Sequence, residues 1–322
     1  MPPVSLLVIA DKKSAAMAPV SRVPEGVRTV VTDDPEELKA QAPLADAILF
    51  AHGNSELLKN TLPLATRARW IHSLWTGVEG ILTQELREHR APLTNGRGVF
   101  RWPLADWVAG VMLFFAFDLR RIVQQQEQGI WKPVFGEMLQ GQTLGIVGYG
   151  SIGSAAAERA RSFGMKIAAL RRRVELFGSE PEVDFNYGPA QLHELMASSD
   201  YVLAATPLTS ETRGLIGAAE LAAMKPGGIL INVGRGPVVD EPALIRSLQS
   251  GAIRGAALDV FDVEPLPAEH PFWKMSNVLL SPHTADRVEG FLGPALDCFL
   301  ENLARFLQDE PLRNIVDKNT GY

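Results

Sequence analysis

The sequence predicts an α/β protein with two lobes, each a parallel sheet flanked by helices. Its 322 residues are enough for two domains of about 150 residues, and its 46% of hydrophobic residues can form a core in both. Short apolar runs alternate with helix-like segments along most of the chain, which is typical of parallel sheets. One apolar run leads directly into a glycine-rich string that opens a helix.

Composition excludes several classes of protein. The 31 basic and 37 acidic residues give a net charge of -6, so we expect no nucleic-acid partner. The longest apolar run, Trp107 to Phe117, has 11 residues, fewer than the roughly 20 that cross a bilayer, and residues 1–10 resemble a first strand rather than a signal peptide. With only Cys298, we predict no disulfide, no cysteine-based metal site and a reducing, cytoplasmic setting with no membrane partner.

In the first lobe, apolar runs predict strands and Leu- and Glu-rich segments predict helices. The strands are Val4–Ile9, Ala47–Phe50 and Trp70–Ser73, and the helices are Pro35–Ala40 and Thr83–Arg90. A helical pattern of about 26 residues then runs from Pro103 to Gln128 and ends before Gly129, which predicts one long helix between the lobes. The amphipathic tail Asp286–Leu307 could cross back and pack on the first lobe.

The second lobe repeats the alternation more regularly. Six strands are predicted at Thr143–Val147, Lys166–Leu170, Tyr201–Ala204, Gly228–Asn232, Ala256–Leu258 and Asn277–Leu280. Helices are predicted at Ile152–Phe163, Ala190–Ala197, Ala218–Ala223 and Glu241–Gln249. This order describes a doubly wound sheet, with Arg173–Pro189 as an irregular insertion.

The glycine-rich string predicts a dinucleotide site. It follows the strand Thr143–Val147 as GYGSIG and consists of Gly148, Tyr149, Gly150, Ser151, Ile152 and Gly153. The first glycine permits a tight turn, the second lets the backbone approach a pyrophosphate, and the third allows close packing of helix on strand. The N–H groups at the helix start would bind the anion.

The end of the next strand indicates which dinucleotide binds. An NAD-preferring protein would usually carry Asp or Glu there, whereas Leu170 is followed by Arg171, Arg172 and Arg173. Guanidinium groups can bind a 2′-phosphate through paired, charge-assisted hydrogen bonds. We therefore expect NADP(H) to be preferred and NAD(H) to be possible, although these arginines could also form a solvated basic turn.

Three more strings with reactive side chains follow strands of the second lobe, at the sheet edge where doubly wound sheets bind ligands. They are Asn232–Glu241 (NVGRGPVVDE), Leu258–Leu266 (LDVFDVEPL) and Ser281–Ala285 (SPHTA). With the glycine string and Ala205–Thr209 (ATPLT), they closely resemble the D-isomer-specific 2-hydroxyacid dehydrogenase family. Gly77-Val78 and Asn95-Gly96 extend the resemblance into the first lobe.

The chemistry of these residues agrees with that resemblance. Reduction of a 2-oxo acid needs a hydride for the carbonyl carbon, a proton for its oxygen and a cation for the carboxylate. Arg235 suits the carboxylate and carbonyl. His283 can donate the proton near neutral pH, and Glu264 on its other ring nitrogen would stabilise the imidazolium. Each residue alone could be structural, but the family implies these same roles for all three.

The resemblance implies further contacts. Asp259 would hold the nicotinamide carboxamide, and backbone N–H groups around Gly77 and Val78 would bind the substrate carboxylate. Trp75 and Thr76 precede them, and the indole either limits the substrate pocket or packs in the core. Other cofactor contacts would come from Thr206, Pro207, Val233, Gly234 and Ala285. The remaining histidines lack a comparable carboxylate partner in a strand-end string, although His72 lies near Gly77; they are His52, His72, His89, His193 and His270.

The resemblance also implies the domain organisation. Residues 1–98 and 291–322 would form a flavodoxin-like substrate-binding domain, and residues 99–290 a Rossmann nucleotide-binding domain, with substrate between them. The family implies a homodimer through the cofactor domain. The string Trp131–Phe135 is similar to one in the glyoxylate and hydroxypyruvate reductase branch, where an aromatic side chain reaches the neighbouring subunit's site. Phe135 could do the same, or could pack between domains.

These observations predict NADPH-dependent reduction of a small 2-oxo acid, of the glyoxylate or hydroxypyruvate type, to the D-2-hydroxy acid. One alternative is an NAD-preferring D-2-hydroxyacid dehydrogenase that acts on a larger substrate. Another is a non-catalytic, nucleotide-sensing corepressor of the same fold. A formate or phosphite dehydrogenase is disfavoured, because formate oxidation moves no alcohol proton and gives Glu264 and His283 no task.

Overall fold

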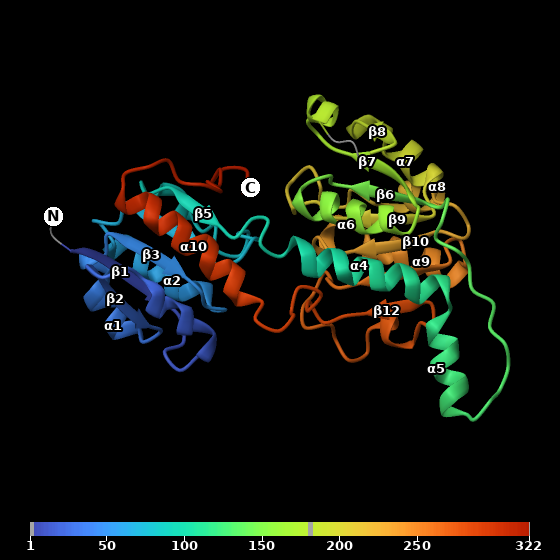
Figure 1. Ribbon diagram of the computed structural model, residues 1–322, viewed down its shortest axis with the longest axis horizontal. Coiled ribbons are helices and arrows are strands. Elements are labelled where there is room, and N and C mark those ends of the chain that lie inside the picture. Colours follow the sequence, from blue (N-terminus) through green and yellow to red (C-terminus); the bar gives the residue numbers. More distant parts are fainter. Residues whose placement is uncertain (1–2, 180–182, 322) are drawn as a thin grey trace. The chain divides into compact units, whose positions relative to one another are not determined.

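The computed structural model describes residues 3–179 and 183–321. The chain divides into two compact units, of which unit 1 is Met1–Phe100 with Val288–Tyr322 and unit 2 is Arg101–Arg287. Each unit is built on one parallel sheet with helices packed against it (Figure 1). The predicted fold class, an α/β protein with two parallel-sheet lobes, is therefore confirmed.

Unit 1 has a five-stranded sheet in the order β2-β1-β3-β4-β5, and every adjacent pair is parallel. This is the flavodoxin-like strand order. The strands are β1 (Val4–Ile9), β2 (Val27–Thr32), β3 (Ala47–Phe50), β4 (Trp70–Ser73) and β5 (Leu93–Asn95). The sequence did not predict β2 and β5, because β2 is a half-exposed edge strand and β5 has only three residues.

Two helices of unit 1, α1 and α2, begin at side-chain caps. Asp34 and Asn54 accept backbone N–H bonds at the starts of α1 and α2. The C-terminal helix α10 returns to this unit, where Phe299 stacks on Trp70 of β4 at 5.3 Å between ring centroids, as predicted for the tail. The elements are η1 (Ala15–Arg22), α1 (Pro35–Gln41), η2 (Ala42–Leu44), α2 (Ser55–Thr61), η3 (Leu62–Leu64), α3 (Gln84–Glu88) and α10 (Leu292–Leu307).

Unit 2 has a seven-stranded parallel sheet in the order β12-β11-β10-β9-β6-β7-β8. Chain order reverses between β6 and β9, as in a doubly wound nucleotide-binding sheet. The strands are β6 (Thr143–Val147), β7 (Lys166–Leu170), β8 (Phe185–Tyr187), β9 (Tyr201–Ala204), β10 (Ile229–Asn232), β11 (Gly255–Leu258) and β12 (Val278–Leu280). The prediction that Arg173–Pro189 is irregular is wrong at β8, which pairs with β7 at the sheet edge; residues 180–182 of that segment lie outside the described residues.

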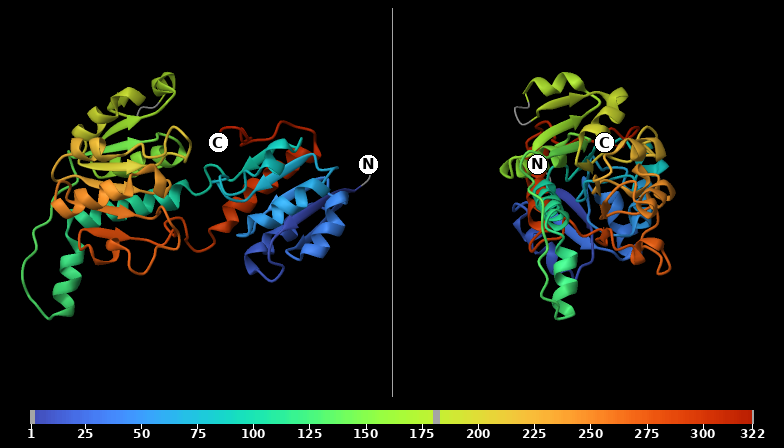
Figure 2. Two further views of the ribbon diagram at one scale, coloured as in Figure 1. Left: turned by 180° about the vertical axis from the view of Figure 1, so that it is seen from behind. Right: turned by 90° about the vertical axis from the view of Figure 1, so that its right-hand side faces the viewer.

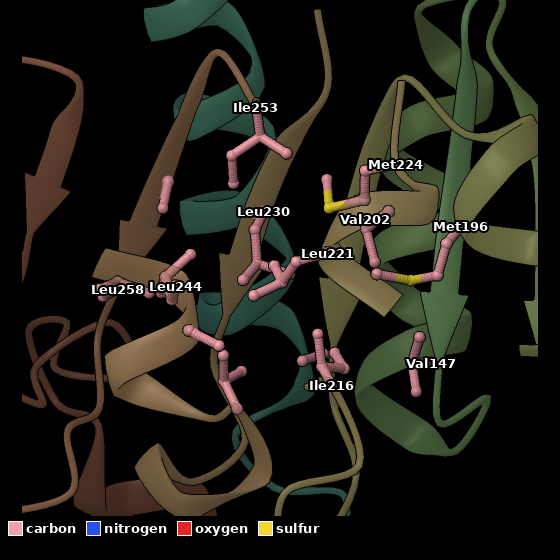
Figure 3. Packing of buried hydrophobic residues seen from close by; sticks show 14 of the residues in the cluster. Val147, Met196, Val202, Ile216, Leu221, Met224, Leu230, Leu244, Ile253 and Leu258 are labelled. Carbon is pink, nitrogen blue, oxygen red and sulfur yellow. The ribbon is translucent and has the colours of Figure 1, made fainter. Parts of the chain in front are cut away.

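Helices cover both faces of this sheet. α4 and α6 pack together on one face (Figure 1), and side chains of α7, α8 and α9 meet those of β9 and β10 on the other, as Met196, Leu221, Leu244, Val202 and Leu230 show in Figure 3. The elements are α4 (Arg101–Ala116), α5 (Leu119–Glu127), α6 (Ser151–Ser162), η4 (Val174–Ser179), η5 (Pro189–Gln191), α7 (Leu192–Ser198), α8 (Ala218–Ala223), η6 (Gly236–Val238), α9 (Glu241–Ser250) and η7 (Pro271–Lys274).

The prediction of one long helix over Pro103–Gln128 is wrong. The helix begins at Arg101 and breaks after Ala116, and α5 continues at 66° to α4. Asp118 adopts the left-handed conformation (φ 47°) at the break, which aspartate tolerates better than most residues. The segment after α5 runs back past this break, where the N–H of Glu137 donates to the carbonyl of Ala116 at 2.8 Å. This bond satisfies a carbonyl at the end of α4 that the helix itself leaves unpaired.

α5 and the segment after it stand away from the rest of unit 2, as Figure 2 shows from two further sides. Within the described ranges, no single helix is long and apolar enough to cross a membrane. α4 and α5 taken together would pass that test by length and composition, although the chain bends sharply between them.

Candidate active site

The glycine string forms a turn between β6 and α6 in which two glycines are required by packing. A Cβ on Gly148 (φ 100°) would lie 2.7 Å from the Thr206 side chain, and one on Gly153 would lie 2.7 Å from the Gly148 carbonyl. A Cβ on Gly150 would meet no atom within 4 Å, so this position faces open space. The turn therefore has the geometry that lets a backbone approach a phosphate.

The start of α6 and the loop after β9 supply donors at this turn. Ser151 and Ile152 open α6, whose N-cap Gly150 provides no side-chain cap, so the first N–H groups of the helix are available to an anion. The buried hydroxyl of Thr206 has no hydrogen-bond partner in the described part of the chain. A buried hydroxyl without a partner is costly, which indicates a site that a ligand completes. These residues fit a bound dinucleotide.

The arginines after β7 lie beside this turn. Arg171 donates to the carbonyl of Tyr149 at 2.8 Å, and its guanidinium carbon lies 5.5 Å from the centroid of the Tyr149 ring. Arg172 is more exposed and pairs with Glu211 at 3.8 Å. Arg171 thus connects the end of β7 to the second residue of the glycine string.

His283 and Glu264 form a direct pair. His283 Nδ1 lies 2.7 Å from Glu264 Oε2, and Glu264 Oε1 accepts the N–H of Phe261 at 3.0 Å. The His283 side chain is 46% exposed, and its Nε2 makes no hydrogen bond within the described residues. The ring is therefore held through one nitrogen and presents the other to a ligand.

The backbone of His283 is also fixed. Its φ is 53°, an uncommon value for a residue other than glycine, and its N–H donates to the carbonyl of Asp259 at 2.9 Å. Asp259 is 2% exposed, and its Oδ1 accepts the N–H groups of Thr284 and Ala285. Burial raises the pKa of Asp259, against the opposing hydrogen bonds from Ser281, Thr284 and Ala285. Asp259 therefore ties the end of β11 to the turn after β12.

Arg235 follows β10 in a braced turn. The buried amide of Asn232 accepts the N–H of Gly234 at 3.1 Å and donates to the Arg235 carbonyl at 3.1 Å, while Val233 donates to the carbonyl of Ala204. A Cβ on Gly234 would lie 2.8 Å from the Thr206 carbonyl, so these two loops pack closely. Arg235 is half-buried, and its Nη1 donates to the Gly234 carbonyl at 2.7 Å.

The predicted substrate loop belongs to unit 1 and is fastened to the loop after β5. Thr76 Oγ1 donates to the Gly96 carbonyl at 2.9 Å, and Asn95 donates to the Thr76 carbonyl at 2.6 Å. The side chain of Val78 is 1% exposed, whereas Trp75 and Gly77 are half-buried. The N–H groups of Gly77 and Val78 have no acceptor among the described residues, so they can bind an anion.

Two of the remaining histidines differ from what the sequence predicts. His72 is completely buried and is bonded through Nδ1 to Thr94 Oγ1 at 2.7 Å, and burial lowers its pKa to about 3; it is therefore not an accessible site residue. The prediction that the others lack a carboxylate partner in a strand-end string is wrong for His270, whose Nε2 lies 3.0 Å from Glu241 Oε1. The sequence hid this pair because 29 residues separate its members.

Comparisons with known proteins agree with this geometry. A family model described as "D-isomer specific 2-hydroxyacid dehydrogenase, NAD binding domain" matches residues 109–285. The chain is 36% identical over 266 residues to a glyoxylate reductase of Korarchaeum cryptofilum, covering 79% of this chain and 77% of that one. It is 36% identical over 279 residues to a glyoxylate/hydroxypyruvate reductase B of Pectobacterium carotovorum, covering 85% and 86%.

One solved structure extends the likeness over the whole chain. It is an NADPH-dependent glyoxylate/hydroxypyruvate reductase from Sinorhizobium meliloti in complex with NADP and sulfate, with a TM-score of 0.85 at 25% identity, covering 99% of this chain and 100% of that one. The fold and these matches define a nicotinamide-dependent oxidoreductase. More closely, the chain belongs to the D-isomer-specific 2-hydroxyacid dehydrogenase family, which confirms the resemblance drawn from the strand-end strings.

Proposed function

We propose that this protein reduces a small 2-oxo acid, of the glyoxylate or hydroxypyruvate type, to the D-2-hydroxy acid with NADPH. The observation that carries the proposal is the 2.7 Å pair of His283 and Glu264, which holds a ring with a free Nε2 at the ligand-binding edge of a doubly wound sheet. The activities for which the relatives from Pectobacterium carotovorum and Sinorhizobium meliloti are named support the substrate class.

Each residue has a definite part in the reduction. The reduced nicotinamide, when bound, supplies a hydride to the carbonyl carbon. Arg235 holds the substrate carboxylate and orients the carbonyl face. His283 donates the Nε2 proton to the carbonyl oxygen and becomes neutral, and Glu264 stabilises the imidazolium before that transfer. Asp259 positions the cofactor's carboxamide and fixes the backbone of His283.

We propose that Arg171 and Arg172 give NADPH its advantage over NADH. No carboxylate stands at the end of β7, where it would repel a 2′-phosphate, and Arg171 already lies over the glycine string. The remaining cofactor contacts are assigned to the glycine string, to Thr206 and Pro207 after β9, to Val233 and Gly234 after β10, and to Ala285 after β12. NAD(H) remains a usable cofactor in this proposal.

The two units divide the task. We propose that unit 2 binds the cofactor, and that unit 1 binds the substrate carboxylate through the N–H groups of Gly77 and Val78. Trp75 and Thr76 lie on the same loop and would limit the size of the substrate's side chain. The half-buried state of Trp75 supports this role over a core position.

A cofactor and substrate panel tests the proposal. Oxidation of NADPH and of NADH is followed with glyoxylate, hydroxypyruvate, pyruvate and phenylpyruvate. We expect turnover with NADPH and the two small acids, and slower turnover with NADH or phenylpyruvate. Tight NADPH binding with no turnover of any acid would favour the nucleotide-sensing corepressor, and a preference for NADH with the larger acid would favour the alternative dehydrogenase.

We also propose a homodimer formed through unit 2. The segment after α5 exposes large apolar side chains, including Trp131 (101%), Phe135 (92%) and Met138 (72%). Glu137 anchors this segment through an ion pair with Arg254 at 2.9 Å. Exposed apolar side chains gathered on one segment are typical of a protein–protein interface. In sedimentation equilibrium, we expect a dimer for the parent, a monomer for Trp131→Glu with Phe135→Glu, and a dimer for the unit 1 control Leu64→Glu. A parent monomer would refute the dimer.

A further inference from the structure

The loop that carries Arg235 and the loop that carries Glu264 touch through their backbones. A Cβ on Gly236, the residue after Arg235, would lie 2.0 Å from the Phe261 carbonyl carbon and 2.5 Å from the Asp262 nitrogen. Phe261 in turn donates its N–H to Glu264. The position of the Phe261–Glu264 turn therefore sets both the place of Glu264 and the surface on which the Arg235 loop rests.

His270 lies further along the loop that carries Glu264. Its side chain bonds to Glu241, which follows the Arg235 loop in the sequence. Its Nε2 is 3.0 Å from Oε1 of Glu241, the first residue of α9, and both side chains are more than four-fifths buried. His270 Nδ1 accepts the N–H of Phe272 at 3.4 Å, so the ring proton lies on Nε2 and points to Glu241. A directed hydrogen bond to a partly buried carboxylate is stronger than an exposed ion pair.

Aromatic packing joins this bond to the turn that holds Glu264. The ring of His270 packs on Phe272 at 4.8 Å between centroids, and Phe272 packs on Phe261 at 6.4 Å. Phe272 is 1% exposed and Phe261 is 7% exposed. A continuous set of contacts thus runs from Glu241 through His270, Phe272 and Phe261 to Glu264.

We propose that the His270–Glu241 pair is a positioning pair for the reductase site, which holds the Phe261–Glu264 turn against the Arg235 loop and so keeps Glu264 on His283. This inference rests on the proposed function of Glu264 and His283. Neither His270 nor Glu241 touches substrate or cofactor in this proposal. Both act through the loop between β11 and β12.

Other charged groups surround the pair and must be kept constant in a test. Burial raises the pKa of Asp262, and the carboxylates of Glu241 and Asp240 raise it further, while Arg213 and His270 lower it. Glu264 and Asp259 are the carboxylates that face His283. Substitutions at His270 leave all of these other side chains in place, so a shift in pH dependence reports on the pair.

The variants are His270→Leu, which removes the bond, and His270→Gln, whose amide can still donate to Glu241. Because losing one hydrogen bond to a charged group corresponds to about a tenfold effect or more, we expect His270→Leu to lower kcat about tenfold with little change in KM. We also expect the pH above which reduction falls to move to a lower value. His270→Gln should keep most of the parent's kcat and most of its pH profile. The matched control is His193→Leu, which breaks a 2.8 Å histidine–glutamate contact between α7 and α8 and should change neither.

Amide hydrogen exchange measures how firmly the Phe261–Glu264 turn is held, and it does so without an activity assay. Opening the turn exposes the Phe261 amide, so exchange over residues 259–264 should rise in His270→Leu and not in His193→Leu. In a Glu264→Gln background, His270→Leu should move the pH profile no further.

A lower melting temperature with unchanged exchange and an unchanged pH profile would overturn the positioning role. If the parent reduces no oxo acid, the proposed function fails, and the exchange result still decides whether the pair holds the turn.

Discussion

Two histidines of this chain occupy opposite surroundings, one in each unit. His72 lies inside β4, packed against the rings of Trp70 and Phe299, with the neutral hydroxyl of Thr94 at 2.7 Å. His283 lies beyond the end of β12, nearly half exposed, with the carboxylate of Glu264 at the same distance. The difference shows that the partner and the exposure of a histidine, rather than its presence near a motif, decide whether it can transfer a proton.

The comparison extends to whole elements. Polar side chains within the strands of unit 1 bond to one another, as Trp70 and His72 each do to Thr94, and Nε2 of His72 is buried with no partner among the described residues. Polar side chains beyond the strand ends of unit 2 are more exposed, as His283 is at 46%. Substitutions at the two kinds of position should therefore have different effects.

The largest effect is expected for the exposed histidine. His283→Ala removes the proton donor, and general acid catalysis contributes about 10²- to 10⁴-fold. We expect kcat for oxo-acid reduction to fall by that range while KM changes little, because the lost interaction is made mainly in the transition state. Steady-state kinetics measure it. His193→Ala should keep the parent kcat, and a His283→Ala enzyme with the parent kcat would show that the proton comes from another group.

A smaller effect is expected at the end of β7. Arg171→Ala removes a charge-assisted bond to the 2′-phosphate, worth about 1.5 to 3 kcal/mol, so NADPH should bind roughly 10- to 100-fold more weakly. NADH should be almost unaffected, as fluorescence titration can show. Lys166→Ala removes the same charge at the opposite end of the same strand and is the control. Equal losses for both cofactors would exclude phosphate recognition by Arg171.

A third effect is expected for the buried histidine, and it concerns stability rather than activity. Burial lowers the pKa of His72 to about 3 in the folded chain, from 6.5 without burial. Its contribution is therefore fully present above pH 6.5 and is lost as pH falls toward 3, by up to about 1.4 kcal/mol for each pH unit. Urea unfolding at pH 7.5 and 4.5 should show a smaller pH dependence for His72→Leu than for the parent. Identical pH dependence would mean that the unfolding step does not expose His72.

The sequence predicted the sheets better than their edges. Strands such as Val4–Ile9 and Thr143–Val147 are mostly buried on both faces, so they read as nearly continuous apolar runs that stand out in the sequence. β5 and β8 have three residues each and lie at sheet edges, where pairing rather than hydrophobicity defines them. At the break after Ala116, the Ala116 carbonyl accepts the N–H of Glu137, 21 residues away, and no local pattern predicts that contact.

The same distinction applies to the site. A string such as GYGSIG is contiguous in the sequence, so the need for its glycines can be predicted locally. The structure supports that need at Gly148, which has a positive φ, and at Gly153, where a Cβ would meet the Gly148 carbonyl. The His270–Glu241 pair and the close approach of Gly236 to Phe261 are long-range contacts between strings. A single sequence shows the residues that could do the chemistry, but not the contacts that hold one string against the next.

The central claim, that Glu264 supports His283 as proton donor, is tested most directly by the pH dependence of kcat for NADPH-driven reduction in the parent and in Glu264→Gln. We predict that the parent rate falls as pH rises, because the imidazolium is lost. The fall should begin at a lower pH in Glu264→Gln, where the imidazolium has no carboxylate partner. Rates that stay level from mild acid into alkali, or profiles that coincide in the two proteins, would contradict the account.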